Sequence, residues 1–496
     1  MKKKLVCLLA ILVCLSQLAG CGEKTASNRD GKPVLRVLVQ WSDMDYSKYP
    51  IGKMLEEKTG YSVVYETLPS SKPEDKLNLL ISSQEEYDLI TVPCSATMKS
   101  LFFNYVEKGA IEPLDEYIKK TNNLKDVMND HEFDSIKVDG KSYAVPTASN
   151  PDLRGGMFIR TDWLEKLGLE MPQTIDEFTK VLEAFKQSNL SSGATGVIPL
   201  TIDSTAVINN LVGAFGLACE WNDVDGRLVN RAQDPRMKEY LSYINMLYTK
   251  GLLDPEFPTN KYNTIQEKFA TGQAGVAYFS WWDTGSVLSA LKESFPEATA
   301  DYMPVLTGPN GYKGVDKQHN LEMLSFVPKA SKHKKEVIDW IDKKLDKEVF
   351  KDMFVGVEGV HHEVKDGEYY PIQPKFTDER NEAAKYRTGI LKEDYAKYLR
   401  ARRRQDEVVF KYWKELNQEM PEEDIVTDYI GLVPYLPVYT SECQVFSAFA
   451  AENYINFAAG TNPLSKYDEF LDKCKDKKLD VMTDEINGWY TEFRKG

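Results

Sequence analysis

Two tryptophans and an aspartate, Trp281, Trp282 and Asp283, stand side by side directly after an apolar stretch, Ala274 to Ser280. The stretch is typical of a buried strand, and Asp283 does not suit a strand interior, so the indoles belong at the strand's end. Paired aromatic rings beside a carboxylate can form a flat apolar platform with a hydrogen-bonding rim. Sugar rings, with apolar faces and hydroxyl edges, fit such a platform. The alternative is that both indoles are core residues that cover the sheet.

Other candidate binding residues follow predicted strands at 34–40, 87–92 and 141–146. Ligands of open α/β sheets bind beyond the carboxyl ends of the strands, so the residues after each strand are expected near the ligand. These residues are Trp41, Asp43, Ser95, Thr147 and Asn150. Trp41 with Asp43 repeats the combination of an indole and a carboxylate.

Two further features each allow two interpretations. Trp221 stands in a polar loop, GLACEWNDVDG, where an indole is either exposed for binding or packed as an anchor of its loop. A basic run, Arg400 with 402–404, lies within a helical pattern over 391–416. Such a run usually forms a solvated helix face, and the alternatives are docking to an acidic surface or holding an acidic sugar.

No sequence motif of an enzyme, cofactor site or metal site is recognisable. The five histidines form no HExxH pattern, and no GxSxG or glycine-rich phosphate loop is present. We therefore expect a protein that is not an enzyme and that uses neither cofactor nor metal. A glycosidase remains an alternative, because the separation of its two carboxylates is spatial and does not show in a sequence.

The first 32 residues predict export and attachment to a membrane. Lys2 to Lys4 precede an apolar run, Leu5 to Leu15, which is typical of a signal peptide over 1–20. The following sequence, LAGC, resembles the bacterial lipobox, whose cysteine carries diacylglycerol and palmitate, so Cys21 is the expected lipidation site. Acyl chains on Cys21 and a flexible tether over 21–32 would hold the protein on the extracytoplasmic face of the cell membrane. The alternative is an ordinary signal peptide with a chance cysteine.

The composition predicts a protein that does not bind nucleic acid. The chain of 496 residues has a formal net charge of −14, which opposes electrostatic binding of nucleic acid. Its length suits two or three domains, and no second apolar segment reaches transmembrane length. Four later cysteines, Cys94, Cys219, Cys443 and Cys474, are compatible with two disulfides or with free thiols.

Strands and helices alternate along the chain. Strands at 34–40, 61–68 and 87–92 enclose helical patterns at 49–59 and 72–82. This β-α-β-α-β order predicts an α/β fold with a mainly parallel sheet covered by helices. A second α/β unit follows the first, with helices at 161–167, 174–185 and 234–251 and the strand before Trp281.

Several segments in order resemble one family. KTGYSVVYE, DGKSYAVP, FIRTDWLEKLGLEMPQTIDEF, GQAGVAYFSWWD and FVPKASKHKKEVIDWI look like the extracellular solute-binding lipoproteins of carbohydrate ABC importers, in particular the large members that bind oligosaccharides or polysaccharides. The resemblance implies a two-lobed clamp of the type II periplasmic-binding-protein kind, in which each lobe has a mainly parallel sheet flanked by helices and the ligand lies between the lobes. The implied N-terminal lobe spans 33–145 plus about 307–360, and the C-terminal lobe spans 146–306 plus about 361–496.

The resemblance also implies a function and site residues. The implied protein is a monomer that captures an oligosaccharide and delivers it to ABC transporter permease subunits. The family's corresponding strand ends in cleft tryptophans, which supports Trp281 and Trp282, and EGVHH places Glu358 near the junction of the lobes. Some large members carry a calcium loop, but its counterpart here, NLSSGATGVIP, has no carboxylate, so no calcium is expected. A lipid-anchored glycoside hydrolase and a surface sensor or adhesin with the same clamp are the alternatives.

Overall fold

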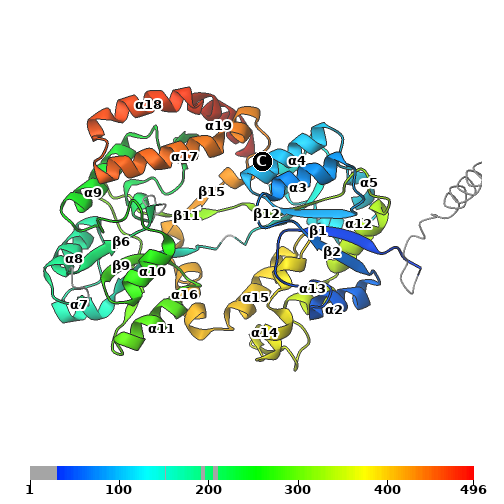
Figure 1. Ribbon diagram of the computed structural model, residues 1–496, viewed down its shortest axis with the longest axis horizontal. Coiled ribbons are helices and arrows are strands. Elements are labelled where there is room, and N and C mark those ends of the chain that lie inside the picture. The colour runs from blue at the N-terminus through cyan, green and yellow to red at the C-terminus, as the bar shows by residue number, and fades with distance from the viewer. Residues whose placement is uncertain (1–30, 151, 192–195, 205–209, 496) are drawn as a thin grey trace, which may run out of the picture.

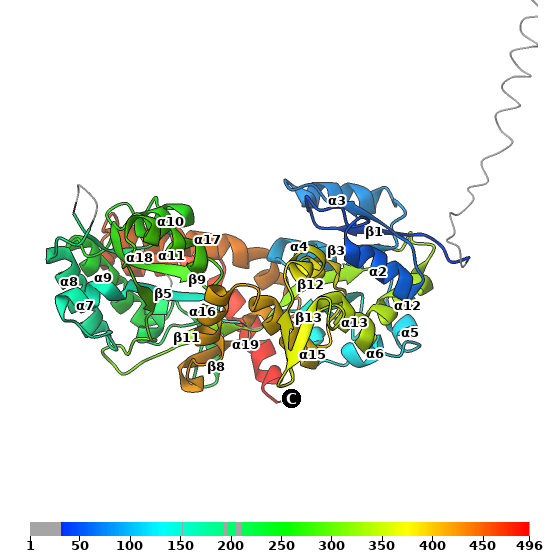
Figure 2. The same ribbon diagram turned by 90° about the horizontal axis from the view of Figure 1, so that it is seen from below.

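The computed structural model describes residues 31–150, 152–191, 196–204 and 210–495. The predicted signal peptide, Cys21 and most of the predicted tether lie outside these residues. The described chain forms two lobes side by side, each built around a β-sheet with helices against it (Figures 1 and 2). The predicted two-lobed α/β architecture is confirmed.

The sheet of the first lobe has the strand order β2-β1-β3-β12-β4. Strands β1 (Leu35–Val39), β2 (Val63–Thr67) and β3 (Leu89–Pro93) run parallel, as the alternation with α2 (Pro50–Thr59) and α3 (Pro73–Ser82) predicts. Strands β4 (Ala144–Ala148) and β12 (Leu321–Phe326) complete the sheet, and β12 runs antiparallel to both β3 and β4. The chain passes to the second lobe after β4 and returns to the first lobe at β12. The two crossing segments therefore both connect to the sheet of the first lobe.

The sheet of the second lobe has the strand order β10-β5-β9-β6. Strand β9 (Ala274–Ser280) pairs parallel with β6 (Ile198–Thr201) and antiparallel with β5 (Gly155–Arg160), which in turn pairs antiparallel with β10 (Ala300–Tyr302). Among the described residues, two of the three strand pairs of this sheet are therefore antiparallel, whereas a mainly parallel sheet was expected. The helices α7 (Thr161–Leu167), α8 (Ile175–Gln187), α9 (Pro235–Thr249), α10 (Tyr262–Ala270) and α11 (Thr284–Ser294) belong to this lobe. Thr174 and Glu177 form the capping box at the start of α8.

The boundary of the first lobe lies later in the chain than the sequence predicts. Residues after about 360 were expected in the second lobe, but Phe376, Tyr386 and Tyr395 belong to the hydrophobic core of the first lobe. The reason is the aromatic face of α15 (Lys392–Arg403), which packs on α13 (Lys347–Phe354): the rings of Tyr395 and Phe354 are 5.1 Å apart. The chain therefore returns to the second lobe between α15 and α16 (Glu407–Asn417).

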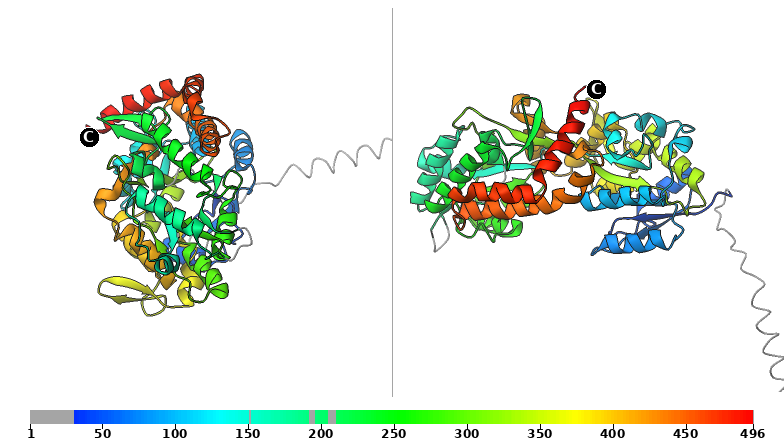
Figure 3. Two further views of the ribbon diagram at one scale, coloured as in Figure 1. Left: turned by 90° about the vertical axis from the view of Figure 1, so that its left-hand side faces the viewer. Right: turned by 90° about the horizontal axis from the view of Figure 1, so that it is seen from above.

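The two lobes also touch along one side, through helices that are far apart in sequence. Helix α17 (Pro437–Ala459) of the second lobe reaches α4 (Ala96–Glu107) of the first (Figures 1 and 3). Thr97 donates a hydrogen bond of 3.1 Å to Gln444, and Lys99 donates one of 2.6 Å to the carbonyl of Val433. We call this contact the spine of the molecule.

Two further expectations concern the described residues as a whole. Cys94, Cys219, Cys443 and Cys474 carry free thiols, so the structure favours that alternative over disulfides. Across the described residues, no helix is both long enough and apolar enough to span a bilayer.

A buried lysine lies where the first lobe supports the segment that leads into α15. Lys344, at the end of α12 (Lys334–Lys344), donates a hydrogen bond of 2.8 Å to Thr388, and its ammonium group lies 4.2 Å from the centre of the Trp340 ring. No carboxylate among the described residues pairs with Lys344. Burial accordingly lowers the pKa of Lys344 to about 7. Gly389, which follows Thr388, donates a hydrogen bond of 3.2 Å from its backbone N–H to Thr147 Oγ1. This bond attaches the segment before α15 to β4.

Substituting Lys344 with Met should change how stability depends on pH. The pKa of Lys344 is about 7 in the folded protein and about 10.4 in an unfolded chain, so between these values the unfolded chain binds the additional proton. Wild-type stability should therefore rise with pH in this window, by up to about 1.4 kcal/mol per pH unit relative to Lys344→Met. Urea unfolding between pH 7.5 and 9.5 measures this difference. Lys335→Met, at an exposed position of the same helix, is the control; parallel curves for wild type and Lys344→Met would contradict the assignment.

Candidate ligand-binding cleft

A cavity of about 320 Å³ lies where the two lobes meet. Its walls come from the first lobe (the start and end of α15 and the preceding segment), from the second lobe (Trp281 and Trp282), and from the crossing segments around Asn150 and Asn320. Pockets that bind small ligands have volumes of this order and are commonly found between domains. We call this cavity the cleft.

The strand pairing of β5 with β9 fixes the position of the two indoles. Gly155 pairs with Ser280 so closely that a Cβ atom on Gly155 would lie 2.2 Å from the carbonyl oxygen of Phe279. The pairing continues past the strand end, where the backbone N–H of Trp281 donates to the carbonyl of Arg154 at 3.0 Å. Trp281 therefore directly follows β9 at its carboxyl end, as the sequence predicts.

The two indoles have different environments. The side chain of Trp281 is 6% exposed, whereas that of Trp282 is 48% exposed. Their rings lie 4.9 Å apart at 87°, and the guanidinium of Arg403 lies 4.3 Å from the centre of the Trp281 ring. Trp281 is thus covered by Arg403 and by its neighbour, while Trp282 keeps a free face for contact with a ligand.

Asp283 supports the strand end and does not line the cleft. Its carboxylate accepts a hydrogen bond of 2.7 Å from the hydroxyl of Tyr262, and that hydroxyl accepts one of 3.0 Å from the backbone N–H of Ser280. The carboxylate therefore helps to hold the end of β9 in place. The hydrogen-bonding groups that the sequence predicts beside the indoles must come from other residues.

Of the remaining candidates, Asn150 lines the cleft, and its side-chain amide donates to Asp152. Thr147 is fully buried on β4, with its hydroxyl accepting from Gly389, so a ligand cannot reach it. Ser95 caps α4 by accepting from the backbone N–H of Met98 at 3.3 Å. These last two side chains serve the fold, because both satisfy backbone donors.

Three other candidates lie outside the cleft. Trp41 and Asp43 are exposed in the segment after β1. Glu358 is exposed in the turn between α13 and β13 (His362–Lys365), on the first lobe.

Trp221 is buried, which excludes its interpretation as an exposed binding residue. It begins the hairpin of β7 (Trp221–Val224) and β8 (Arg227–Asn230), and its ring meets that of Tyr439 on α17 at 6.4 Å. It lines a separate cavity of about 280 Å³ within the second lobe. The surrounding sequence is polar, but one aromatic partner of Trp221, Tyr439, comes from α17, more than 200 positions away.

Sequence reasoning missed most of the charged residues of the cleft. Arg387, Arg402 and Arg403 enter it from the first lobe, and Asp152 and Glu322 lie on or beside the crossing segments. The basic run contained Arg402 and Arg403, but its usual interpretation as a solvated helix face is wrong for them. Residues four apart lie on the same face of a helix, so Arg400 and Arg404 share one face of α15, and Arg402 and Arg403 point elsewhere.

The other half of the basic run binds a hairpin. Arg400 and Arg404 both contact Glu368 on β14 (Glu368–Pro371), at 2.6 and 2.8 Å. The hydrogen bonds from Arg400 and Arg404 lower the pKa of Glu368 to about 2. This face of α15 therefore holds the hairpin, while the other face serves the cleft.

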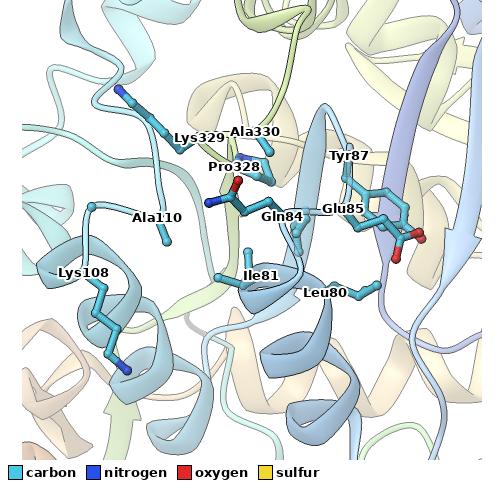
Figure 4. A pocket seen from close by; sticks show the side chains of 12 residues that line it. Leu80, Ile81, Gln84, Glu85, Tyr87, Lys108, Ala110, Pro328, Lys329 and Ala330 are labelled. Carbon is cyan, nitrogen blue, oxygen red and sulfur yellow. The ribbon is translucent and has the colours of Figure 1, made fainter. Parts of the chain in front are cut away.

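A hollow of about 220 Å³ on the first lobe lies at the other end of the strands from the cleft, and Figure 4 shows the side chains that line it. Tyr87, Lys108 and Lys329 line it, near the start of β3 and beyond the end of β12. The cleft, in contrast, lies near Glu322 at the start of β12. None of the candidate residues from the sequence lies in this hollow, so the cleft is the better candidate for function.

Comparison with known proteins identifies the family. A model of the family described as "Bacterial extracellular solute-binding protein" matches residues 40–348. This chain belongs to that family. Solute binding outside the cell, which the description of the family names, agrees with a cleft between two lobes.

Two relatives and one solved structure illustrate the similarity of this solute-binding protein to known proteins. Lipoprotein LipO of Bacillus subtilis is 25% identical over 97% of both chains. The fructooligosaccharide ABC transporter substrate-binding protein FusA of Streptococcus pneumoniae is 30% identical over 66% of both chains. The structure of FusA from S. pneumoniae in complex with kestose has a TM-score of 0.69 at 22% identity and covers 93% of this chain and 99% of that one. The structural comparison supports the fold.

The solute-binding protein shows no metal cluster in its described part. No group of three or more histidine, cysteine, aspartate or glutamate side chains there could hold an ion. The loop that corresponds to the family's calcium loop lies partly outside the described residues.

Alanine at Trp281 and at Trp282 should have opposite effects on stability. Trp281→Ala removes a buried ring from the core and should lower the free energy of unfolding by roughly 3 to 5 kcal/mol. Trp282→Ala removes a half-exposed ring and should cost less than about 1 kcal/mol. Denaturant titration of the ligand-free protein measures both values. Equal losses in the two variants would contradict the division of the pair into a packed and an exposed indole.

Proposed function

We propose that this solute-binding protein captures an oligosaccharide outside the cell and delivers it to the permease subunits of an ABC importer. The observation that carries the proposal is the half-exposed Trp282 at the cleft between the lobes. An indole face next to hydrogen-bonding side chains matches the apolar face and hydroxyl edge of a pyranose. Family membership supports the proposal independently, and FusA is named for its fructooligosaccharide ligand.

The polar residues that would bind sugar hydroxyls come from several elements. Asn150, Gln318 and Asn320 of the crossing segments and Tyr395 of α15 line the cleft together with Trp282. Amide side chains can donate and accept hydrogen bonds, which suits hydroxyl groups that do both. Because the walls belong to both lobes, movement of the lobes toward each other would enclose the sugar.

Trp41 is proposed as an additional contact from the first lobe. It is exposed in the segment after β1, and its neighbour Ser42 accepts a hydrogen bond of 3.0 Å from Lys385. Lys385 belongs to the short helix η4 (Ala383–Tyr386), of which Ala384 lines the cleft. Trp41 therefore lies beside an element of the cleft and could contact a ligand that extends beyond Trp282.

The protein is proposed to be held at the cell membrane by lipid on Cys21. The support is the sequence LAGC after an apolar run, together with the similarity to a protein named lipoprotein LipO. A tether between Cys21 and β1 would let the lobes stay close to the permease while they capture ligand.

A panel of oligosaccharides should identify a ligand that raises the melting temperature, and Trp282→Ala should weaken its binding. Loss of a stacking indole should cost about 1.4 kcal/mol or more, which corresponds to at least a tenfold higher Kd. Isothermal titration measures the affinity. Trp489→Ala, at a partly exposed tryptophan on α19 (Leu479–Phe493) outside the cleft, is the control. Unchanged affinity in Trp282→Ala would refute the stacking role, and release of smaller sugars during incubation would indicate a hydrolase.

Replacing Cys21 with Ser should release the protein from membranes. Without a thiol there is no site for acylation, and the polar segment after it has no apolar group to insert in a bilayer. Fractionation of cells that express each form measures the distribution between membrane and medium. Retention of Cys21→Ser in the membrane fraction would exclude lipidation at this position as the anchor.

A further inference from the structure

The charges that line the cleft are unbalanced in favour of cations. Four arginines line it, Arg154, Arg387, Arg402 and Arg403, together with two carboxylates, Asp152 and Glu322. The whole chain has a formal net charge of −14, so the cleft has the opposite sign to the protein around it. Fields inside a cleft are screened less than those on an open surface, and an excess of one sign selects ligands of the other.

The two carboxylates do not neutralise all four arginines. Glu322 pairs with Arg387. Asp152 lies 3.6 Å from Arg403, but the same carboxylate oxygen also accepts a hydrogen bond of 3.0 Å from the indole N–H of Trp413. Burial raises the pKa of Asp152, which reduces the negative charge available to Arg403 at low pH.

The other two arginines have no carboxylate partner in the described part of the chain. Arg402 donates only to backbone carbonyls, those of Arg380 at 2.9 Å and Asn381 at 2.5 Å. Arg154 is exposed, and its side chain makes no hydrogen bond or ion pair with the described residues. Arg402 and Arg154 therefore form no ion pair in the cleft, and the carboxylates of Glu382 and Asp316 act on them only through longer-range attraction.

The environment of Arg402 and Arg403 is unfavourable for their charge when no ligand is bound. Burial lowers the pKa of Arg402 to about 10 and also lowers the pKa of Arg403. The Nε–H group of Arg403 is buried and has no hydrogen-bond partner among the described residues. A buried donor without a partner adds to the cost of this environment, and an anion bound in the cleft would offset the positive charge of the guanidinium.

We propose that the ligand is an acidic oligosaccharide, one that contains uronic acid residues, and that Arg154, Arg402 and Arg403 bind its carboxylates while a sugar face stacks on Trp282. Arginine suits this role because its planar guanidinium can bind a carboxylate through two parallel hydrogen bonds. A neutral sugar would bury the same cations without an opposite charge when the lobes approach each other. This inference rests on the proposed function and specifies the class of sugar.

The test compares acidic oligosaccharides with neutral forms of the same chain. The probes are tetragalacturonate and its fully methyl-esterified form, and glucuronic acid-substituted xylo-oligosaccharide and the unsubstituted form, with a fructooligosaccharide as an unrelated neutral sugar. Isothermal titration with the folded protein should show that at least one acidic probe binds ten or more times more tightly than its neutral form. Raising the NaCl concentration should weaken binding of the acidic probe more than that of the neutral one.

Arg154→Gln tests whether the positive charge of Arg154 contributes to binding of an acidic sugar. The position is exposed, so the substitution should not impair folding. It should weaken binding of the acidic probe at least fivefold and weaken binding of the neutral form by a clearly smaller factor. Arg227→Gln removes the same charge from an exposed position on β8, outside the cleft, and should change neither affinity. A loss of affinity in Arg227→Gln equal to that in Arg154→Gln would point to a general effect of net charge and overturn the assignment.

The outcomes separate this inference from the proposed function. If only neutral probes bind, or if acidic and neutral forms bind equally, the inference is overturned and capture of an oligosaccharide stands. If an acidic probe binds preferentially but Arg154→Gln has no effect, the assignment to these arginines is overturned. If no oligosaccharide binds at all, the inference is overturned together with the proposed function.

Discussion

The contact between Arg403 and Trp281 joins the two lobes at the cleft. Arg403 belongs to α15 of the first lobe, and its guanidinium covers the ring of Trp281, which follows β9 of the second lobe, at 4.3 Å. A guanidinium is planar and weakly hydrated, so it can stack on an indole and keep its charge in a partly buried place. The guanidinium therefore covers Trp281, whereas Trp282 remains half exposed beside the cleft.

The sequence predicted those features that depend on residues close together in the chain. It failed for features that depend on packing between residues far apart in the chain. The alternation of strands and helices predicted the two-lobed α/β fold, and the polar and aromatic residues after 274–280 predicted the strand end at Trp281. The assignment of 361–401 to a lobe was wrong, because it depends on the packing of Tyr395 on Phe354. Trp221 is buried by α17, and the different exposure of Trp281 and Trp282 depends on Arg403, so no local pattern shows either feature.

One helix, α15, performs two roles because its arginines point in different directions. Arg400 and Arg404 share a face and hold Glu368 of the hairpin, so their charges are used within the first lobe. Arg402 and Arg403 lie on the other side and reach the cleft. The hairpin therefore fixes the rotation of the helix about its axis, and that rotation determines which cations a ligand meets. An isolated count of basic residues contains none of this information.

The spine formed by α4 and α17 limits how the lobes can move. Thr97 with Gln444 and Lys99 with Val433 hold the lobes together along one side, while α11 and α14 (Lys375–Arg380) on the other side are separate (Figure 1). If one lobe rotates about the spine, each of its atoms moves in proportion to its distance from the spine. Small adjustments at Lys99 would thus become large displacements at the far rim, where α11 and α14 lie.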